Sequence, residues 1–280
     1  MFTYHYLFHN GPLAALALLV ALNLPALAQV DVGLAPMRVE VTAVPGKPVS
    51  GSLTLTNSGS TPARFRVEMV DFYIDENTTP QFIGQVAAEA PYSCRSWLTA
   101  NPMELEVAPK SQSPVRYTVR IPPNATESSY HCALGFRTIP KPDEISGTAM
   151  RTAVRLMTVF YPTVGKPPVT GVIKDLTLQS TPTASGSSWK AILLMENSGL
   201  MLYRPVGDIS VVDASGALIE TVKVPSFPVL PKRQQRIVVP ISKSLAPGSY
   251  TLQANVEVAG EIQKASVVVT ASAQAMAPPQ

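Results

Sequence analysis

The chain has 280 residues, of which 46% are hydrophobic and only 15% are charged, and its formal net charge is +3. This length allows two separate hydrophobic cores, because domains of roughly 100–150 residues are the commonest size. The positive charge is small and scattered, which argues against nucleic acid as a partner. The 27 prolines mostly stand between alternating apolar runs, where they punctuate strands.

The first predicted element is a secretory signal peptide at residues 1–28. An uncharged apolar run spans residues 13–24, and Ala26-Leu27-Ala28 forms a small-x-small cleavage site. The preceding segment carries His5 and His9 but neither Lys nor Arg, and an uncleaved membrane anchor is the alternative. Because the run is shorter than the roughly 20 residues that span a bilayer, we expect cleavage. The mature protein is then periplasmic or associated with the cell surface, without stable membrane insertion.

A first all-β domain is predicted over residues 29–163. Apolar and polar residues alternate along its strands, most cleanly at 115–121, and Asn57-Ser58-Gly59 ends an early strand. The segment 130–139 is more continuously apolar, as expected for a strand in the centre of a sheet. The last strand of this domain is expected at 150–161, after a polar loop.

Cys94 and Cys132 are the only cysteines. An even pair in an exported protein favours a disulfide, and two buried free thiols are the alternative. His131 is the only histidine left after signal cleavage, so we expect a packed strand residue and no metal site. Hydrolytic triads usually need a histidine beside the nucleophile, and no phosphate-binding loop occurs. The sequence therefore predicts a non-enzyme that needs no cofactor.

Residues 164–168 form a predicted linker, stiffened by Pro167-Pro168. A second β-sandwich of immunoglobulin- or fibronectin-like type is expected over 169–271, and residues 272–280 read as a fraying tail. Helical periodicity is absent over any useful length. The predicted fold class is all-β, with two tandem immunoglobulin-like β-sandwich domains after the signal peptide.

Two stretches of the chain repeat one another in order, which supports this division. Each has a strand that ends in Asn-Ser-Gly, then a turn opened by Pro-Lys, and then a strand that starts near Ser-Tyr. The first copy lies at 57–59, 109–110 and 129–130, and the second at 197–199, 231–232 and 249–250. A repeat of domain size is typical of tandem sandwiches, which bind more often than they catalyse.

The first domain resembles the N-terminal domain of periplasmic pilus-assembly chaperones over roughly residues 30–165. The residues that carry the resemblance are Arg38-Val39, Asn57, 103–109, Glu127-Ser128-Ser129-Tyr130, 136–140 and 156–162 with Phe160-Tyr161. The resemblance implies two domains set at an angle. It also implies pilus or surface-fibre subunits as partners, with an outer-membrane usher as a further one.

The resemblance further implies that the last strand of the first domain donates alternating side chains to an incomplete subunit. The matching side chains here are Met150, Thr152, Val154 and Leu156. The alternative is that this face packs into the core of its own domain.

A subunit's C-terminal carboxylate is held in that family by two basic residues, of which Arg38 matches the first. The second is a lysine two residues before Phe160, where this chain has Thr158. The second domain looks like a generic bacterial immunoglobulin- or fibronectin-like module. The alternative function is therefore a structural envelope module that binds cell wall or surface proteins.

Overall fold

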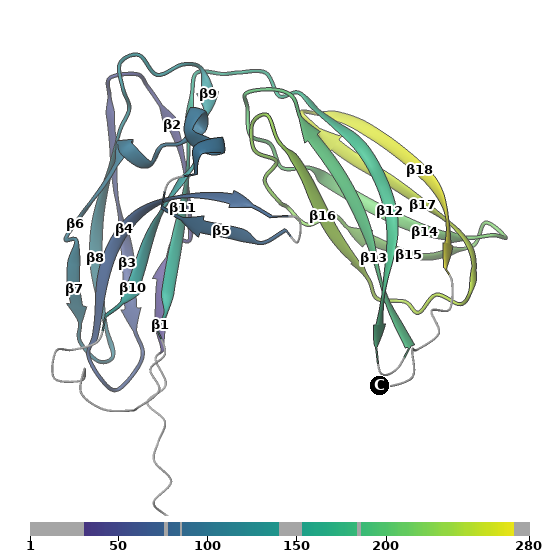
Figure 1. Cartoon of the computed structure of the whole chain (residues 1–280), viewed down its shortest axis with the longest axis horizontal. Helices are drawn as coiled ribbons and strands as arrows, with labels where there is room; N and C mark the ends of the chain where they lie inside the picture. Colours follow the sequence, from purple (N-terminus) through teal and green to yellow (C-terminus); the bar gives the residue numbers. More distant parts are fainter. Residues whose placement is uncertain (1–30, 76–77, 85, 140–152, 184–185, 272–280) are drawn as a thin grey trace, which may run out of the picture.

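The computed structural model describes residues 31–75, 78–84, 86–139, 153–183 and 186–271 (Figure 1). The expected signal peptide, the tail, and the candidate residues Met150 and Thr152 lie outside this range. Almost all regular structure is β-strand, arranged as two sandwiches, so the predicted fold class is confirmed. Within the described range, no helix is long and apolar enough to cross a membrane.

The first sandwich packs a four-stranded sheet against a seven-stranded sheet. The four-stranded sheet has the order β1 (Val32–Ala35), β3 (Pro48–Asn57), β8 (Ser111–Arg120) and β6 (Leu98–Asn101). The path of the seven-stranded sheet is β2 (Arg38–Ala43), β11 (Arg155–Val164), β10 (Cys132–Thr138), β4 (Ala63–Ile74) and β5 (Pro80–Ile83). Off this path, β7 (Glu104–Val107) pairs with β4 and β9 (Ser128–Ser129) pairs with β11. Two short 3₁₀ turns, η1 (Ala87–Tyr92) and η2 (Arg95–Trp97), lie between β5 and β6.

The first strand of this sandwich changes sheets. Its first half, β1, pairs with β3 in the four-stranded sheet, and its second half, β2, pairs in parallel with β11 in the other. Pro36 lies between the two halves. The change of sheet means that β2 reaches β11 only from Arg38 onward, opposite Val159.

The second sandwich packs a three-stranded sheet against a four-stranded sheet. The three-stranded sheet has the order β12 (Gly171–Thr183), β13 (Gly186–Asn197) and β16 (Gln234–Ile241). The four-stranded sheet has the order β15 (Leu218–Lys223), β14 (Val206–Asp213), β17 (Gly248–Val258) and β18 (Glu261–Ala271). Each sandwich encloses one large apolar cluster, as the alternating pattern of the strands predicts.

The repeat in the sequence is also a repeat of polar contacts. Asn57 is buried, and its Nδ2 donates to the carbonyl oxygens of Thr61 (2.8 Å) and Val107 (3.0 Å), while its Oδ1 accepts from Gly59 N (3.0 Å). In the second sandwich the matching bonds join Asn197 to Met201 O (2.8 Å), Val229 O (3.0 Å) and Gly199 N (3.0 Å). Each asparagine therefore fastens its own turn to a second, more distant stretch of backbone.

The lysine and the tyrosine of each repeat also make matching hydrogen bonds in the two sandwiches. Lys110 and Lys232 each donate to a carbonyl of the Asn-Ser-Gly turn in their own sandwich, at Ser58 and Ser198. The tyrosine hydroxyls donate back to the carbonyl four residues earlier, Tyr130 to Thr126 O and Tyr250 to Ala246 O, each at 2.9 Å. Such tyrosine corners are a feature of immunoglobulin-like sandwiches.

Cys94 and Cys132 form a disulfide, as expected, with their Cα atoms 5.2 Å apart. His131, next to Cys132, is buried, forms a bridge with Ser93 and packs edge-on against Phe72 at 5.3 Å. It is a packed residue immediately before β10, which agrees with the prediction.

Candidate functional site

The start of β11 has one unpaired edge. On one side β10 pairs with β11 from Arg155 onward, but on the other side β2 begins only opposite Val159. Along Arg155–Met157, no strand of the described chain therefore pairs with β11 on the β2 side. An open edge of this kind presents backbone N–H and C=O groups to an incoming strand.

The two faces of β11 have different surroundings. Leu156, Thr158 and Phe160 point toward the core of the first sandwich, where Leu156 packs at the margin and Phe160 is fully buried. Met157 and Val159 lie on the opposite face. Val154 is half-buried, and its backbone N–H donates to Thr138 Oγ1 at 2.9 Å. Of the candidate donor side chains, Leu156 thus packs against its own sandwich.

Thr158 explains why no lysine stands at this position. Its side chain is fully buried and its hydroxyl donates to Pro36 O at 2.8 Å. A lysine here would place its charge in the core of the sandwich, at a large desolvation cost. A second cation near Glu40 comes from another part of the chain.

That second cation is Arg204, from the second sandwich. Glu40 Oε1 lies 2.8 Å from Arg204 Nη1 and 3.4 Å from Arg38 Nε. The Arg204 guanidinium carbon also lies 5.1 Å from the centroid of the Tyr161 ring. Arg38 is 55% exposed and Arg204 only 15%, so the accessible part of this group is Arg38. Nothing in the sequence placed Arg204 beside Glu40, because the two come together only through the packing of the two sandwiches.

Tyr161 is buried beside these charged side chains. Burial raises the pKa of Tyr161 to about 12, against the opposing effect of the positive charges on Arg204 and Arg38. An unfolded chain releases this proton near the ordinary value of 10.0, so between those two pH values the unfolded state binds fewer protons than the folded state. The stability from this group is therefore present below pH 10.0 and is lost as the pH rises toward 12.

We expect the urea midpoint of the wild type to fall between pH 10 and 12 relative to that of Tyr161→Phe, which has no proton to lose. The measurement is urea unfolding of both proteins at pH 9, 10, 11 and about 12, compared as a difference so that other tyrosines cancel. A difference that stays constant over this range would contradict the burial of the phenol.

Further contacts join the two sandwiches near their shared end. Ser129 N donates to Leu200 O at 2.8 Å, and Leu202 N donates to Ser129 Oγ at 3.1 Å. A cavity of about 500 Å³ lies beside these residues, between β2, the end of β11 and residues 201–204. An apolar cluster continues from there and includes Val70, Phe72, Ala133, Tyr161 and, from the second sandwich, Leu230. We call the face of the seven-stranded sheet that carries this cluster the cleft face.

The hairpin of β4 and β5 extends the cleft face toward the second sandwich (Figure 1). Near its tip, Thr78 Oγ1 donates to Arg236 O on β16 at 3.2 Å. A smaller cavity of about 320 Å³ lies between the hairpin and the start of β16. The hairpin thus spans the space between the two sandwiches.

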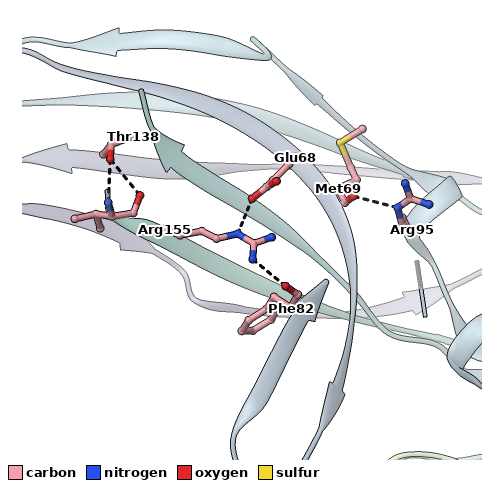
Figure 2. A network of polar contacts seen from close by, with 7 residues as sticks. Glu68, Met69, Phe82, Arg95, Thr138 and Arg155 are labelled. Carbon is pink, nitrogen blue, oxygen red and sulfur yellow. Dashed lines mark hydrogen bonds and ion pairs between the residues drawn. The ribbon is translucent and has the colours of Figure 1, made fainter. Parts of the chain in front are cut away.

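Arg155 connects the open edge of β11 to this hairpin, as Figure 2 shows. Its Nε lies 2.6 Å from Glu68 Oε1 on β4, and its Nη1 donates to Phe82 O on β5 at 2.8 Å. To reach Glu68 the side chain crosses β10 at Gly135, where an added Cβ would lie 2.9 Å from Glu68 Cγ. Because Gly135 has no side chain, it leaves room for the ion pair between Arg155 and Glu68.

No metal centre is assembled: among the residues that the structure covers, no group of three or more His, Cys, Asp or Glu side chains is placed to hold an ion. Asp71 is buried and accepts hydrogen bonds from Ser93 Oγ (2.5 Å) and Val86 N (3.1 Å). Asp71 thus fastens the segment before η1 to β4.

No protein-family model matches the chain, and no curated protein matches it. Among solved structures, it is similar to the YadV chaperone at 12% identity, over 85% of this chain and 100% of that chain, with a TM-score of 0.43. The CupB2 chaperone of Pseudomonas aeruginosa matches at 12% identity, over 84% and 98%, with a TM-score of 0.40. A chain from the Salmonella enterica complex of SafA pilin with the SafB chaperone matches at 13%, over 86% and 97%, with a TM-score of 0.42. All three similarities lie at 13% identity or below, with TM-scores of 0.43 or less.

Proposed function

We propose that this protein is a periplasmic, chaperone-like binding protein for pilus or surface-fibre subunits, and that it has no enzymatic activity. In this proposal residues 1–28 direct export, 29–163 form the subunit-binding domain, and 164–168 link it to a second domain at 169–271. The observation that carries the proposal is the open edge of β11. It offers main-chain hydrogen bonds on a strand that the rest of the sheet holds in place.

Binding proceeds by strand pairing in this proposal. A subunit strand lies beside the start of β11, and every second side chain of the donor segment enters a groove of the subunit. The donor side chains are Met150, Thr152, Val154 and Leu156. Leu156 already packs partly against its own sandwich. Among the described positions, Val154 is therefore the one at which a substitution tests strand donation most directly.

Arg38 is the proposed anchor for the C-terminal carboxylate of the subunit. Its side chain is more than half exposed, and its present ion partner is Glu40 on the same strand. An incoming carboxylate would share Arg38 with Glu40, while Arg204 keeps Glu40 in place from the other side. The usher remains a proposed further partner.

The test is affinity purification of the tagged mature protein from its native envelope, followed by mass spectrometry. We expect a small, β-rich subunit in one-to-one ratio, and Val154→Asp should reduce its recovery at least about ten-fold, because a charge enters the apolar groove. Val172→Asp is the matched control, since Val172 is an exposed valine on β12 of the second sandwich. Circular dichroism confirms that both variants are folded.

Two results contradict the proposal. Equal recovery of the subunit with wild type and folded Val154→Asp would remove the role of the donor strand. Recovery of cell-wall fragments, with no subunit, would favour the structural envelope module instead.

A further inference from the structure

Three arginines stand in one row across the cleft face. In the strand register, Arg137 on β10 lies opposite Arg66 on β4 and opposite Arg155 on β11. All three share the face of Gly135, where Glu68 and Met157 also meet. Side chains directly opposite on neighbouring strands have Cβ atoms about 5 Å apart, so like charges there repel. A structure selected only for stability would not place three arginines in this way.

The two outer arginines have carboxylate partners, whereas the central one has none among the residues that the structure describes. Arg66 Nε lies 2.8 Å from Glu104 Oε1, and Arg155 Nε lies 2.6 Å from Glu68 Oε1. Arg137 is exposed, and no carboxylate of the described chain lies within ion-pair distance of it. The row therefore has a local excess of positive charge centred on Arg137.

We propose that Arg137, flanked by Arg66 and Arg155, binds an acidic side chain of the protein partner. This inference rests on the proposed function, because Arg155 belongs both to the row and to the open edge of β11. An acidic residue on a strand paired to that edge would lie opposite Arg155, with Arg137 one strand further into the sheet, about 10 Å from the partner strand. It would thereby fix the register in which the partner strand pairs, which a sequence of alternating apolar residues fixes only weakly.

The charges around the row select a carboxylate-bearing peptide rather than a long polyanion. Glu104 and Glu68 flank the row on β7 and β4, so the positive field is confined to about one arginine. One or two carboxylates fit such a site, whereas a nucleic acid or an anionic membrane needs an extended basic surface. The planar guanidinium can also hold a carboxylate through two parallel hydrogen bonds.

The test uses fluorescently labelled hexaglutamate and hexaserine peptides with the full mature protein, measured by fluorescence anisotropy. We expect hexaglutamate alone to bind, and Arg137→Gln to weaken it about ten-fold. Arg116→Gln is the matched control, because Arg116 is exposed on β8 in the other sheet and pairs with no carboxylate of the described chain. It should change the affinity less than about two-fold. Equal weakening by both variants, or equal binding of both peptides, would overturn the proposal.

A stability measurement separates a binding role from a structural one. If the row is kept for binding, Arg137→Gln removes repulsion and should raise the urea midpoint, while Arg116→Gln leaves it unchanged. A lower midpoint for Arg137→Gln would mean that Arg137 supports the fold, and the proposal would be wrong.

The failure of this inference can be told from the failure of the proposed function. Loss of the subunit with Val154→Asp, together with full recovery by Arg137→Gln, would overturn the arginine site and leave strand donation intact. If the envelope yields no subunit, the proposed function fails. The hexaglutamate assay needs no subunit, so it still decides whether Arg137 binds acidic peptide.

Discussion

Replacing Cys94 and Cys132 together by alanine is expected to lower the free energy of unfolding of the first sandwich by roughly 3–4 kcal/mol. The bond joins residues 38 apart in sequence, and both sulfur-bearing side chains are fully buried. It fastens the segment between η1 and η2 to the first residue of β10, which in turn pairs with Phe160 on β11. Loss of the bond should therefore loosen the strand proposed to bind subunits.

The two tryptophans allow this to be measured in each sandwich separately. Trp97 packs on Tyr130 at 4.3 Å in the first sandwich, and Trp189 is buried in the second. In a Trp189→Phe background the remaining tryptophan is Trp97, so urea unfolding followed by fluorescence should show the full expected decrease in the free energy of unfolding of the first sandwich. In a Trp97→Phe background, the transition of Trp189 should move little. The wild type under reducing conditions should behave like the double alanine variant, and a loss below about 1 kcal/mol would contradict the expected role of the bond.

Asn57→Ala and Asn197→Ala are the second pair of substitutions with large expected effects. Each removes two donated bonds and one accepted bond at a buried site. The carbonyl of Val107 loses the bond from Asn57, and the carbonyl of Val229 keeps only a long bond from Tyr203 N at 3.4 Å. An unsatisfied buried carbonyl costs about 1–3 kcal/mol, so we expect each variant to lose roughly 2–4 kcal/mol in its own sandwich.

The same pair of tryptophan backgrounds provides the measurement. Asn57→Ala should move the Trp97 transition and Asn197→Ala the Trp189 transition. The control is Asn124→Ala, because Asn124 is exposed in a loop, and it should cost less than about 0.5 kcal/mol. If the three alanine variants are equally stable, the repeated asparagines do not hold the turns as described.

The features that sequence reasoning found are those whose causes are local. Alternation along 115–121 predicts β8, since one face of a strand is buried and the other is not. The pairing of Cys94 with Cys132, which is present in the structure, is predicted by their even number together with the expected export. The repeated asparagines were visible as a motif, although their bonds to Val107 and Val229 were not.

The features that it missed depend on which strands are neighbours and in what register. Alternation divides β11 into two faces, but it does not say which face is buried, so the inward position of Thr158 could not be read from the chain. The ion pair of Glu40 with Arg204 requires the two sandwiches to be placed against each other. The row through Arg137 exists only because β4, β10 and β11 pair in one register.

The contacts between the two sandwiches have a consequence for the thermodynamics of binding. They are separated along the interface, with Glu40 to Arg204 and Ser129 to Leu200 near the shared end and Thr78 to Arg236 at the hairpin tip. Two sandwiches that are held together at separated contacts cannot rotate about a single hinge. Its concave side is therefore preorganised, and a partner that docks there loses its own conformational entropy but little of the receiving protein's. Most of the ordering on association then takes place in the partner, as the proposed binding of incompletely folded subunits would require.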